Sequence, residues 1–252
     1  MIKGIDLSTY QRNVDYKKLK EDGIEFAILR IGYGKDAGQR DEMFDEHYAG
    51  CRAVGIKVGA YHYSYCTTEK NAILEAENCL KYLDGIELDL PVFYDLEDKA
   101  ILNNNVDVEK IATKFCNRIF ADGYDAGVYA SLNWFNNYLD INELNSLGIY
   151  IWLAQWNDKI TADFPVDIWQ NTNNIFDSDE GERIDGDYLI NESLLNNDIE
   201  PSPIIDVNIC QSLAVDVIYG RYGNGEERKK ALGNYYYEVQ DIVNDMYEII
   251  GG

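Results

Sequence analysis

Two carboxylates, Asp95 and Glu97, follow a short apolar run in the segment Leu90-Pro-Val-Phe-Tyr-Asp-Leu-Glu-Asp98. The run predicts a buried strand, and side chains two residues apart on an extended chain point to the same side, with Cα atoms about 6.6 Å apart. Two carboxyl groups in one site can divide into a proton donor and an anion when their surroundings differ. Cleavage of a glycosidic bond needs that division, because the leaving oxygen must be protonated while positive charge develops at the anomeric carbon. A helix N-terminus or a solvated acidic loop is the alternative interpretation.

Three more acids stand near the ends of predicted strands. Asp6 follows the apolar start of the chain and comes just before the polar residue Ser8. Asp185 and Asp187 lie in the segment Ile-Asp-Gly-Asp-Tyr-Leu, after a loop rich in Asn and Asp. Functional residues of (β/α) barrels gather at the C-terminal ends of the strands. If the strands close into a barrel, we therefore expect Asp6 and Asp185 to join Asp95 and Glu97 in one site.

Short β-rich runs alternate with segments of helical period. Eight strands are expected at residues 3–5, 26–31, 57–63, 90–94, 126–130, 150–153, 167–169 and 184–185. Apolar stripes predict helices over 69–83, with Ala72, Ile73, Ala76, Cys79, Leu80 and Leu83 on one face, and over 108–120. Thr68 and Asp107 are the expected N-caps. Residues 154–166 and 171–183 show no such stripe, so the α/β barrel is expected to be irregular.

Seven segments resemble glycoside hydrolase family 25 in their order and spacing. They are Gly4-Ile-Asp-Leu-Ser8, Phe26-Ala-Ile-Leu-Arg-Ile-Gly-Tyr-Gly34, Gly59-Ala-Tyr-His-Tyr63, Tyr94-Asp-Leu-Glu97, Ile151-Trp-Leu-Ala154, Trp169-Gln170 and Ile184-Asp185. The resemblance covers residues 1 to about 190 and implies an irregular TIM-like (β/α) barrel of eight strands and about five helices. It also implies a phage endolysin, an N-acetylmuramidase that hydrolyses the β-1,4 bond between N-acetylmuramic acid and N-acetylglucosamine in bacterial peptidoglycan, with no cofactor and no metal.

Position by position, the resemblance implies Glu97 as the general acid/base and Asp95 as the carboxylate that stabilises or captures the anomeric centre. Asp6 and Asp185 become supporting acids that set charge and hydrogen bonding. The family pattern Val-Asp-x-Asn is replaced here by Ile-Asp-Gly-Asp. The sequence therefore leaves open whether Asp185 or Asp187 faces the site.

Two other functions compete with this one. A wall-binding protein with an inactive barrel is disfavoured because both Asp95 and Glu97 are present. A metal-dependent hydrolase with Asp6, Asp95 and Glu97 as oxygen ligands is disfavoured because no cluster of histidines supports it.

Aromatic and polar residues near the predicted strand ends are candidates for sugar contacts. Tyrosine and tryptophan rings can stack on pyranose faces, while arginine and glutamine can bond hydroxyl or acetamido groups. The candidates are Arg30, Tyr61, Tyr63, Tyr94, Tyr129, Trp152, Gln155 and Gln170. The alternative for each is packing in the barrel core, and for Arg30 a buried ion pair with one of the acids.

Composition and charge argue against several partners. The formal net charge of −23 disfavours nucleic-acid binding, because phosphate recognition needs clustered Lys and Arg. No stretch approaches the roughly 18 apolar residues of a membrane span, and the chain enters a strand at once without the pattern of a signal peptide. We therefore expect accumulation in the cytoplasm of an infected host cell until another factor releases the protein to the wall. Five cysteines without a close pair predict reduced, structural thiols.

The chain changes character near residue 196. A polar stretch holding two of the four prolines predicts a linker over 196–205, between a catalytic barrel at 1–195 and a small module at 206–252. Apolar stripes predict three short helices in this module. Its Gly-Arg-Tyr-Gly-Asn-Gly-Glu-Glu-Arg core is similar to the cell-wall-binding repeats of phage lysozymes, which implies wall contacts by Arg221, Tyr222, Gly223, Asn224 and Arg228. Only one short copy is present, whereas repeats of this type often occur in tandem. We therefore hypothesise that wall avidity comes from a homo-oligomer formed through this module, or from the catalytic domain binding alongside it.

Overall fold

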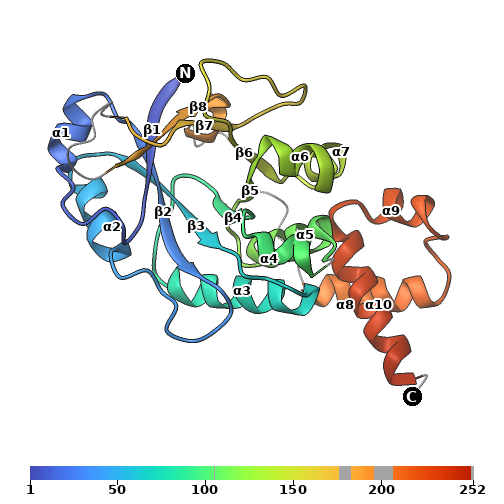
Figure 1. Ribbon diagram of the computed structural model, residues 1–252. Helices are drawn as coiled ribbons and strands as arrows, with labels where there is room; N and C mark the ends of the chain where they lie inside the picture. The colour runs from blue at the N-terminus through green and yellow to red at the C-terminus, as the bar shows by residue number, and fades with distance from the viewer. Residues whose placement is uncertain (105, 176–182, 196–206, 251–252) are drawn as a thin grey trace.

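The computed structural model describes residues 1–104, 106–175, 183–195 and 207–250 (Figure 1). Its eight strands close a barrel in chain order: β1 (Ile2–Leu7), β2 (Phe26–Tyr33), β3 (Lys57–Tyr63), β4 (Val92–Asp95), β5 (Ala126–Ser131), β6 (Tyr150–Ala154), β7 (Ile168–Thr172) and β8 (Asp185–Leu189). Each expected strand overlaps an observed one, which confirms the α/β barrel. Strands β1 to β7 run parallel, whereas β8 is antiparallel to both β7 and β1.

Large side chains fill the interior of the barrel below the level of the acids. They are Phe26, Ile28, Tyr61, Phe93, Tyr129, Trp152, Ile168 and Leu189. Two glycines make room for the aromatic rings, since a Cβ on Gly4 would lie 2.2 Å from the ring of Phe26 and one on Gly127 would lie 2.4 Å from the ring of Phe93. The interior at this level is therefore a packed core that forms a floor for the space above it.

Helices cover the outside of the barrel. They are α1 (Tyr16–Glu21), α2 (Phe44–Ala53), α3 (Glu69–Tyr82), α4 (Lys99–Asn103), α5 (Val108–Ala121), α6 (Leu132–Tyr138) and α7 (Ile141–Ser146), followed by the 3-10 helix η1 (Glu192–Leu195). These are seven α-helices in the described part of the barrel against about five expected, and four of them have only five to seven residues. As predicted, no helix lies between β6 and β7. The segment 176–182 lies outside the described residues.

The two predicted caps are confirmed, because the side chains of Thr68 and Asp107 accept hydrogen bonds from backbone N–H groups in the first turns of α3 and α5. The apolar stripe predicted for α3 needs one correction. Ile73 is 38% exposed, and the position buried in that part of the helix is Glu75, which is 1% exposed. Tertiary hydrogen bonds from Tyr65 and Tyr94 to the Glu75 carboxylate favour this rotation of the helix.

The C-terminal residues form the predicted three-helix module, with α8 (Val207–Ile218), α9 (Glu226–Leu232) and α10 (Tyr236–Ile250), and the 3-10 helix η2 (Gly233–Tyr235) between the last two. Cys210, Ala214, Val217, Leu232, Val239 and Val243 make its core. The module packs beside α5 (Figure 1), where an ion pair joins Lys114 of α5 to Asp241 of α10. A second ion pair joins Lys229 of α9 to Glu143 of α7. The predicted linker at 196–205 lies outside the described residues.

Several buried groups are structural. Cys79 and Cys116 are fully buried, and the loss of hydration raises the pKa of both thiols. His62 is buried too, and burial lowers its pKa to about 4 while its Nε2 donates to the carbonyl of Gly34 at 3.0 Å. These residues stay neutral and outside the cavity described below.

The helices in the described ranges are each too short or too polar to cross a bilayer.

Candidate active site

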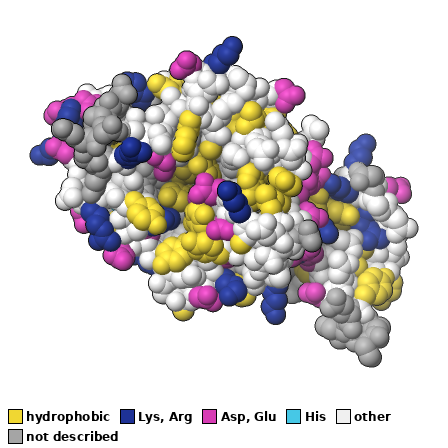
Figure 2. All heavy atoms as spheres, viewed as in Figure 1, with side chains coloured by type: hydrophobic (Ala, Val, Ile, Leu, Met, Phe, Trp, Pro, Cys, Tyr) yellow, Lys and Arg dark blue, Asp and Glu magenta, His cyan; other side chains and the backbone are white. Residues whose placement is uncertain are grey.

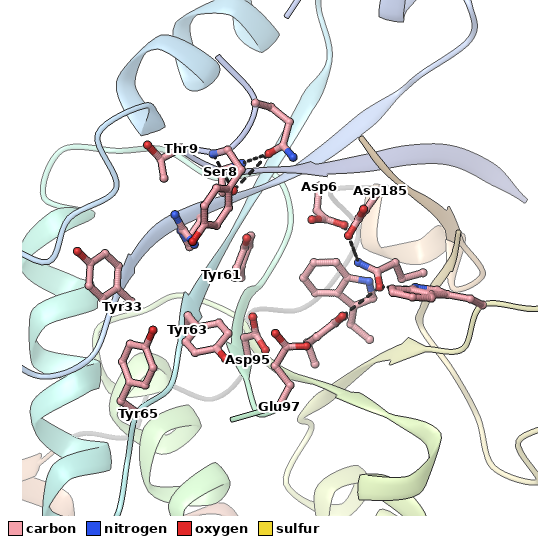
Figure 3. A pocket seen from close by; sticks show the side chains of 17 residues that line it. Asp6, Ser8, Thr9, Tyr33, Tyr61, Tyr63, Tyr65, Asp95, Glu97 and Asp185 are labelled. Atoms are coloured by element: carbon pink, nitrogen blue, oxygen red, sulfur yellow. Dashed lines mark hydrogen bonds between the residues drawn. The ribbon is translucent and has the colours of Figure 1, made fainter. Parts of the chain in front are cut away.

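A cavity of about 680 Å³ opens at the end of the barrel where the parallel strands finish (Figure 3). It is lined by Asp6, Ser8, Thr9, Tyr10, Gln11, Arg30, Tyr33, Tyr61, Tyr63, Tyr65, Asp95, Glu97, Tyr129, Trp152, Trp156, Gln170 and Asp185. On the face shown in Figure 2, hydrophobic side chains gather over the barrel, with acidic side chains among them. A concave site with aromatic walls and a few convergent polar groups is typical of a binding site for a small molecule.

All four acids predicted for catalysis face this cavity. Asp95 and Glu97 lie on one side of it, and Asp6 and Asp185 lie together on the other (Figure 3). The expectation that all four stand at C-terminal ends of strands is wrong for Asp185, which is the first residue of β8. Because β8 is reversed, its first residue reaches the same rim as the last residues of the other strands, where Asp185 pairs in register with Asp6.

The structure distinguishes Asp185 from Asp187. The two side chains point to the same side of β8, but Asp187 lies one layer deeper, 2% exposed, and does not line the cavity. Its Oδ1 accepts a hydrogen bond from Nε1 of Trp152 at 2.8 Å. Asp185 is therefore the acid that a substrate can reach, and Asp187 supports the floor beneath it.

Gln170 holds the Asp6–Asp185 side of the cavity together. Its Nε2 donates to Oδ2 of Asp6 at 2.8 Å and to Oδ2 of Asp185 at 3.3 Å. Its Oε1 accepts from the hydroxyl of Tyr129 at 3.0 Å and from Nε1 of Trp156 at 3.1 Å. The side-chain amide of Gln170 thus links two acids to two aromatic side chains. These four hydrogen bonds also fix which end of the amide is the nitrogen and which is the oxygen.

Burial raises the pKa of every acid in the cavity, and repulsion by neighbouring carboxylates raises it further for Asp6, Asp95 and Glu97. The pKa of Asp6 rises to about 8 because of burial and the charge of Asp185, whose own pKa is raised by burial to about 6. Burial holds the pKa of Asp95 well above its usual range, helped by Glu97 and Asp6 and opposed by the charge of Arg30. The pKa of Glu97 is also raised, by loss of hydration and by Asp185 and Asp98. Protonated and ionised carboxyl groups therefore coexist here near neutral pH.

These shifts predict how stability depends on pH. A carboxyl group whose pKa is higher in the folded chain than in the unfolded chain binds more protons when folded, so the free energy of unfolding falls as pH rises between the two values. For Asp6 this window runs from its ordinary value of 3.8 up to about 8. We expect the melting temperature to fall from about pH 5 to about pH 8, and Asp6→Asn to reduce that slope. Thermal melts of both proteins across this range measure it, and equal slopes would contradict the assignment.

Six of the eight residues predicted for sugar contacts line the cavity: Arg30, Tyr61, Tyr63, Tyr129, Trp152 and Gln170. The prediction is wrong for Tyr94, which alternates with Asp95 along β4 and so points outward, where its ring stacks on Phe115 at 3.9 Å between centroids. It is also wrong for Gln155, whose side chain exchanges hydrogen bonds with Thr161 in the loop after β6.

Arg30 also forms a buried ion pair, as its alternative interpretation predicted, but its partner is not one of the candidate acids. Its Nε donates to Oδ2 of Asp41 at 2.6 Å in a buried ion pair. Asp41 is not one of the acids considered from the sequence, because it lies in the loop after β2 with no strand pattern to mark it. The same side chain lines the cavity, so ion pairing and access to a ligand coexist in Arg30.

Sequence reasoning missed seven residues of the cavity wall: Ser8, Thr9, Tyr10, Gln11, Tyr33, Tyr65 and Trp156. All of them stand at, or within four residues beyond, the ends of β1, β2, β3 and β6. The rule that placed the acids, applied to the loops that follow each strand, would have found them. Three of them are exposed aromatic rings, Tyr10 at 76%, Trp156 at 62% and Tyr65 at 50%.

The predicted wall-binding residues of the module differ in their surroundings. Arg228 donates to the carbonyl of Gly223 at 2.9 Å, to Oδ1 of Asn224 at 3.0 Å and to Oε1 of Gln240 at 2.8 Å, which ties the turn before α9 to α10. Tyr222 is partly buried against the module core. Arg221 pairs with Asp216 at the surface. Arg228 is therefore a structural residue whatever else it contacts.

We expect Arg228→Ala to lower the free energy of unfolding of the module by about 1.5 to 3 kcal/mol, because three polar groups lose a charged partner. Arg221→Ala is the matched control, since an exposed ion pair contributes about 0 to 1 kcal/mol. Chemical denaturation followed by tyrosine fluorescence and circular dichroism compares them. Equal effects of the two substitutions would refute the structural role of Arg228.

Among the described residues, no group of three or more His, Cys, Asp or Glu side chains is arranged to hold a metal ion.

Comparison with known proteins agrees with this geometry. The sequence pattern of glycosyl hydrolases family 25 matches residues 5–179, and the pattern of the CW_7 repeat matches residues 211–246. The autolytic lysozyme of Clostridium acetobutylicum is 26% identical over 156 residues, which cover 62% of this chain and 45% of the relative. Lysozyme M1 of Streptomyces globisporus is 30% identical over 63 residues, 25% of this chain and 21% of the relative. The chain thus spans less than half the length of these two curated relatives.

Solved structures show the same fold. The CTP1L endolysin superposes with a TM-score of 0.67 at 20% identity, over 97% of this chain and 100% of that one. A family 25 glycosyl hydrolase from Bacillus anthracis superposes with a TM-score of 0.64 at 21% identity, over 79% of this chain and 94% of that one. With the barrel, the four acids at its rim and a family pattern that spans most of the chain all in agreement, the chain belongs to glycosyl hydrolases family 25.

Proposed function

We propose that this chain is an N-acetylmuramidase, which hydrolyses the β-1,4 bond between N-acetylmuramic acid and N-acetylglucosamine in bacterial peptidoglycan. The observation that carries the proposal is the placement of Asp95 and Glu97 side by side in a cavity whose surroundings raise the pKa of both. A raised pKa keeps one carboxyl group protonated at neutral pH, as the departing sugar oxygen requires.

Glu97 is the general acid in this proposal. Its side chain is exposed at the cavity mouth, whereas Asp95 is buried with its Oδ1 lacking any partner among the described residues. Glu97 gives its proton to the leaving O4 of glucosamine as the C1–O4 bond breaks. The carboxylate left on Glu97 then accepts a proton from the water that completes hydrolysis.

Asp95 stabilises the reacting sugar. Muramic acid carries a 2-acetamido group, whose carbonyl oxygen can attack C1 as the bond to O4 breaks and form a cyclic intermediate that water opens. We assign Asp95 to orient that group through its N–H, while Asp6, Asp185 and Gln170 complete the opposite wall. The positive charge that develops on the sugar favours the ionised form of the Asp95 carboxyl group, which then balances that charge. Asp95 is suited to this role because it lines the cavity, where the accessible edge of its carboxyl group can accept a hydrogen bond from a substrate N–H.

The walls of the cavity suit a glycan strand. On one side Tyr63 and Tyr65 are 5.0 Å apart and Tyr33 and Tyr65 are 6.3 Å apart between ring centroids. On the other side the exposed ring of Trp156 is anchored by Gln170. Rings on both sides of the acids can stack on sugars before and after the bond that is cut.

The CW_7 repeat supports targeting of the enzyme to the bacterial wall. We further propose the biological role of an endolysin that stays in the cytoplasm of the infected host cell until it is released to the wall, and self-association through the module as a source of avidity. The relatives described as an autolytic lysozyme and an endolysin are consistent with such a role. Light scattering of the full chain tests the association, and a strict monomer would contradict it.

Mass spectrometry of fragments from digested cell walls tests the proposed reaction. We expect new reducing ends on muramic acid, and unchanged rates in the presence of a metal chelator. Reducing ends on glucosamine, or cleaved peptides, would refute the muramidase assignment.

A further inference from the structure

Arg30 is the one cationic side chain that lines the cavity within the described part of the chain. It projects from β2, beside Tyr61 of β3, and only 10% of its side chain is exposed. Four acids share the cavity with it, and its charge opposes the upward shift of the pKa of Asp95. The ion pair alone does not explain why the cationic side chain of Arg30 lines so acidic a cavity.

The guanidinium group of Arg30 is fixed by one of its edges and open at the other. Its Nε donates to Oδ2 of Asp41 at 2.6 Å, and that carboxylate also accepts from the backbone N–H of Thr9 at 3.0 Å. The two terminal nitrogens donate to no atom of the described residues. The rings of Tyr10 and Tyr33 flank the group, at 5.1 and 5.8 Å from its central carbon.

This arrangement is suited to a planar oxygen group. The fork of a guanidinium matches a carboxylate or carbonyl in a way that a single hydroxyl does not, and holding one edge in place reduces the entropy lost when the other edge binds. Repulsion by the four acids would disfavour an anionic substituent anywhere else in the cavity. The ligand group expected at Arg30 therefore carries a carbonyl or carboxylate oxygen.

We propose that Arg30 binds the lactyl group on C3 of muramic acid and thereby distinguishes muramic acid from glucosamine, which lacks that group. The inference rests on the proposed function, which places the acetamido group on C2 against Asp95. The substituent on C3 is the next one around the sugar ring. Arg30 lies on β2, and only β3 separates β2 from β4, the strand that carries Asp95. The lactyl group presents a carboxylate when the peptide is absent and an amide carbonyl when it is attached, and both accept from the fork.

A change in the substrate tests this contact directly. Peptide-free glycan strands carry the lactyl carboxylate, and chemical reduction converts that carboxylate to an alcohol on the same strands. For the full wild-type chain we expect kcat/KM to fall roughly ten- to a hundredfold on the reduced strands, as for the loss of hydrogen bonds to a charged group. In Arg30→Lys, which keeps the charge but loses the fork, we expect this ratio to shrink severalfold because the two changes remove the same contact.

Two controls separate recognition from folding. Arg52→Lys is the matched substitution, because Arg52 pairs with Asp89 at 2.6 Å away from the cavity, and the wild-type ratio should persist in it. The double variant Arg30→Met with Asp41→Asn removes both partners of the buried pair, which avoids leaving Asp41 charged and alone, and it should lose discrimination while melting cooperatively.

The outcomes of this test can be distinguished from those of the experiment that tests the proposed muramidase reaction. If wild-type digests show reducing muramic acid but the ratio is the same in wild type and Arg30→Lys, the lactyl contact alone is refuted. Reducing ends on glucosamine would refute the proposed function and this inference with it.

Discussion

Glu97→Gln is expected to lower kcat on cell walls by about a thousandfold or more, because general acid catalysis contributes about 10² to 10⁴ and an amide cannot replace it. The side chain is exposed at the cavity mouth, so we expect the melting temperature and the binding to insoluble walls to stay as in the wild type. Turbidity assays give the rate, and a pull-down with purified walls gives the binding.

The neighbouring residue provides the control. Asp98 caps α4 by accepting a hydrogen bond from the N–H of Ala100 at 2.7 Å and does not line the cavity. Asp98→Asn should change kcat by less than about twofold, since asparagine is also a good cap. Wall lysis by Glu97→Gln at more than a tenth of the wild-type rate would remove Glu97 from its assigned role.

Asp95→Asn is expected to lower kcat by about 10² to 10³, the effect of removing one charged group that stabilises a transition state. The same change should raise the melting temperature at neutral pH. Asp95 is buried with one oxygen unpartnered among the described residues, and burial holds its pKa well above the usual range. At neutral pH the same carboxyl group ionises readily in the unfolded chain but not in the folded chain, so it lowers the free energy of unfolding. A gain in stability together with a loss in rate is the signature of a functional group rather than a structural one.

Asp187→Asn is the matched control for this substitution. Asp187 is also buried with a raised pKa, but it lies below the cavity, and an asparagine oxygen can still accept from Nε1 of Trp152. We expect its kcat to stay within about tenfold of the wild type, since it contacts no substrate. Calorimetry and initial rates on the two variants settle the comparison. If Asp95→Asn keeps the wild-type kcat, or if Asp187→Asn loses as much kcat as Asp95→Asn, then the assignment of Asp95 to the cavity and Asp187 to its floor is wrong.

The sequence predicted the architecture because the barrel depends on patterns that are local. Apolar runs of strand length, helical stripes and the caps Thr68 and Asp107 each act over a few residues, and the structure confirms them. The same reasoning failed at Ile73 and Glu75 of α3, where a periodic pattern alone allows a small rotation of the helix. Long-range hydrogen bonds from Tyr65 and Tyr94 to Glu75 favour the observed rotation.

By itself, the sequence determined that acidic and aromatic residues follow the strands of a barrel, because residue types and their spacing near strand ends can be read directly from the sequence. Only the tertiary structure decided which residues line the cavity at the rim of the barrel. It reversed β8, which brings Asp185 beside Asp6, placed Asp187 a layer lower, and turned Tyr94 away from the cavity. The physical reason is that strand direction and side-chain alternation are fixed by pairing with neighbouring strands, which are distant in the chain and carry no local signature.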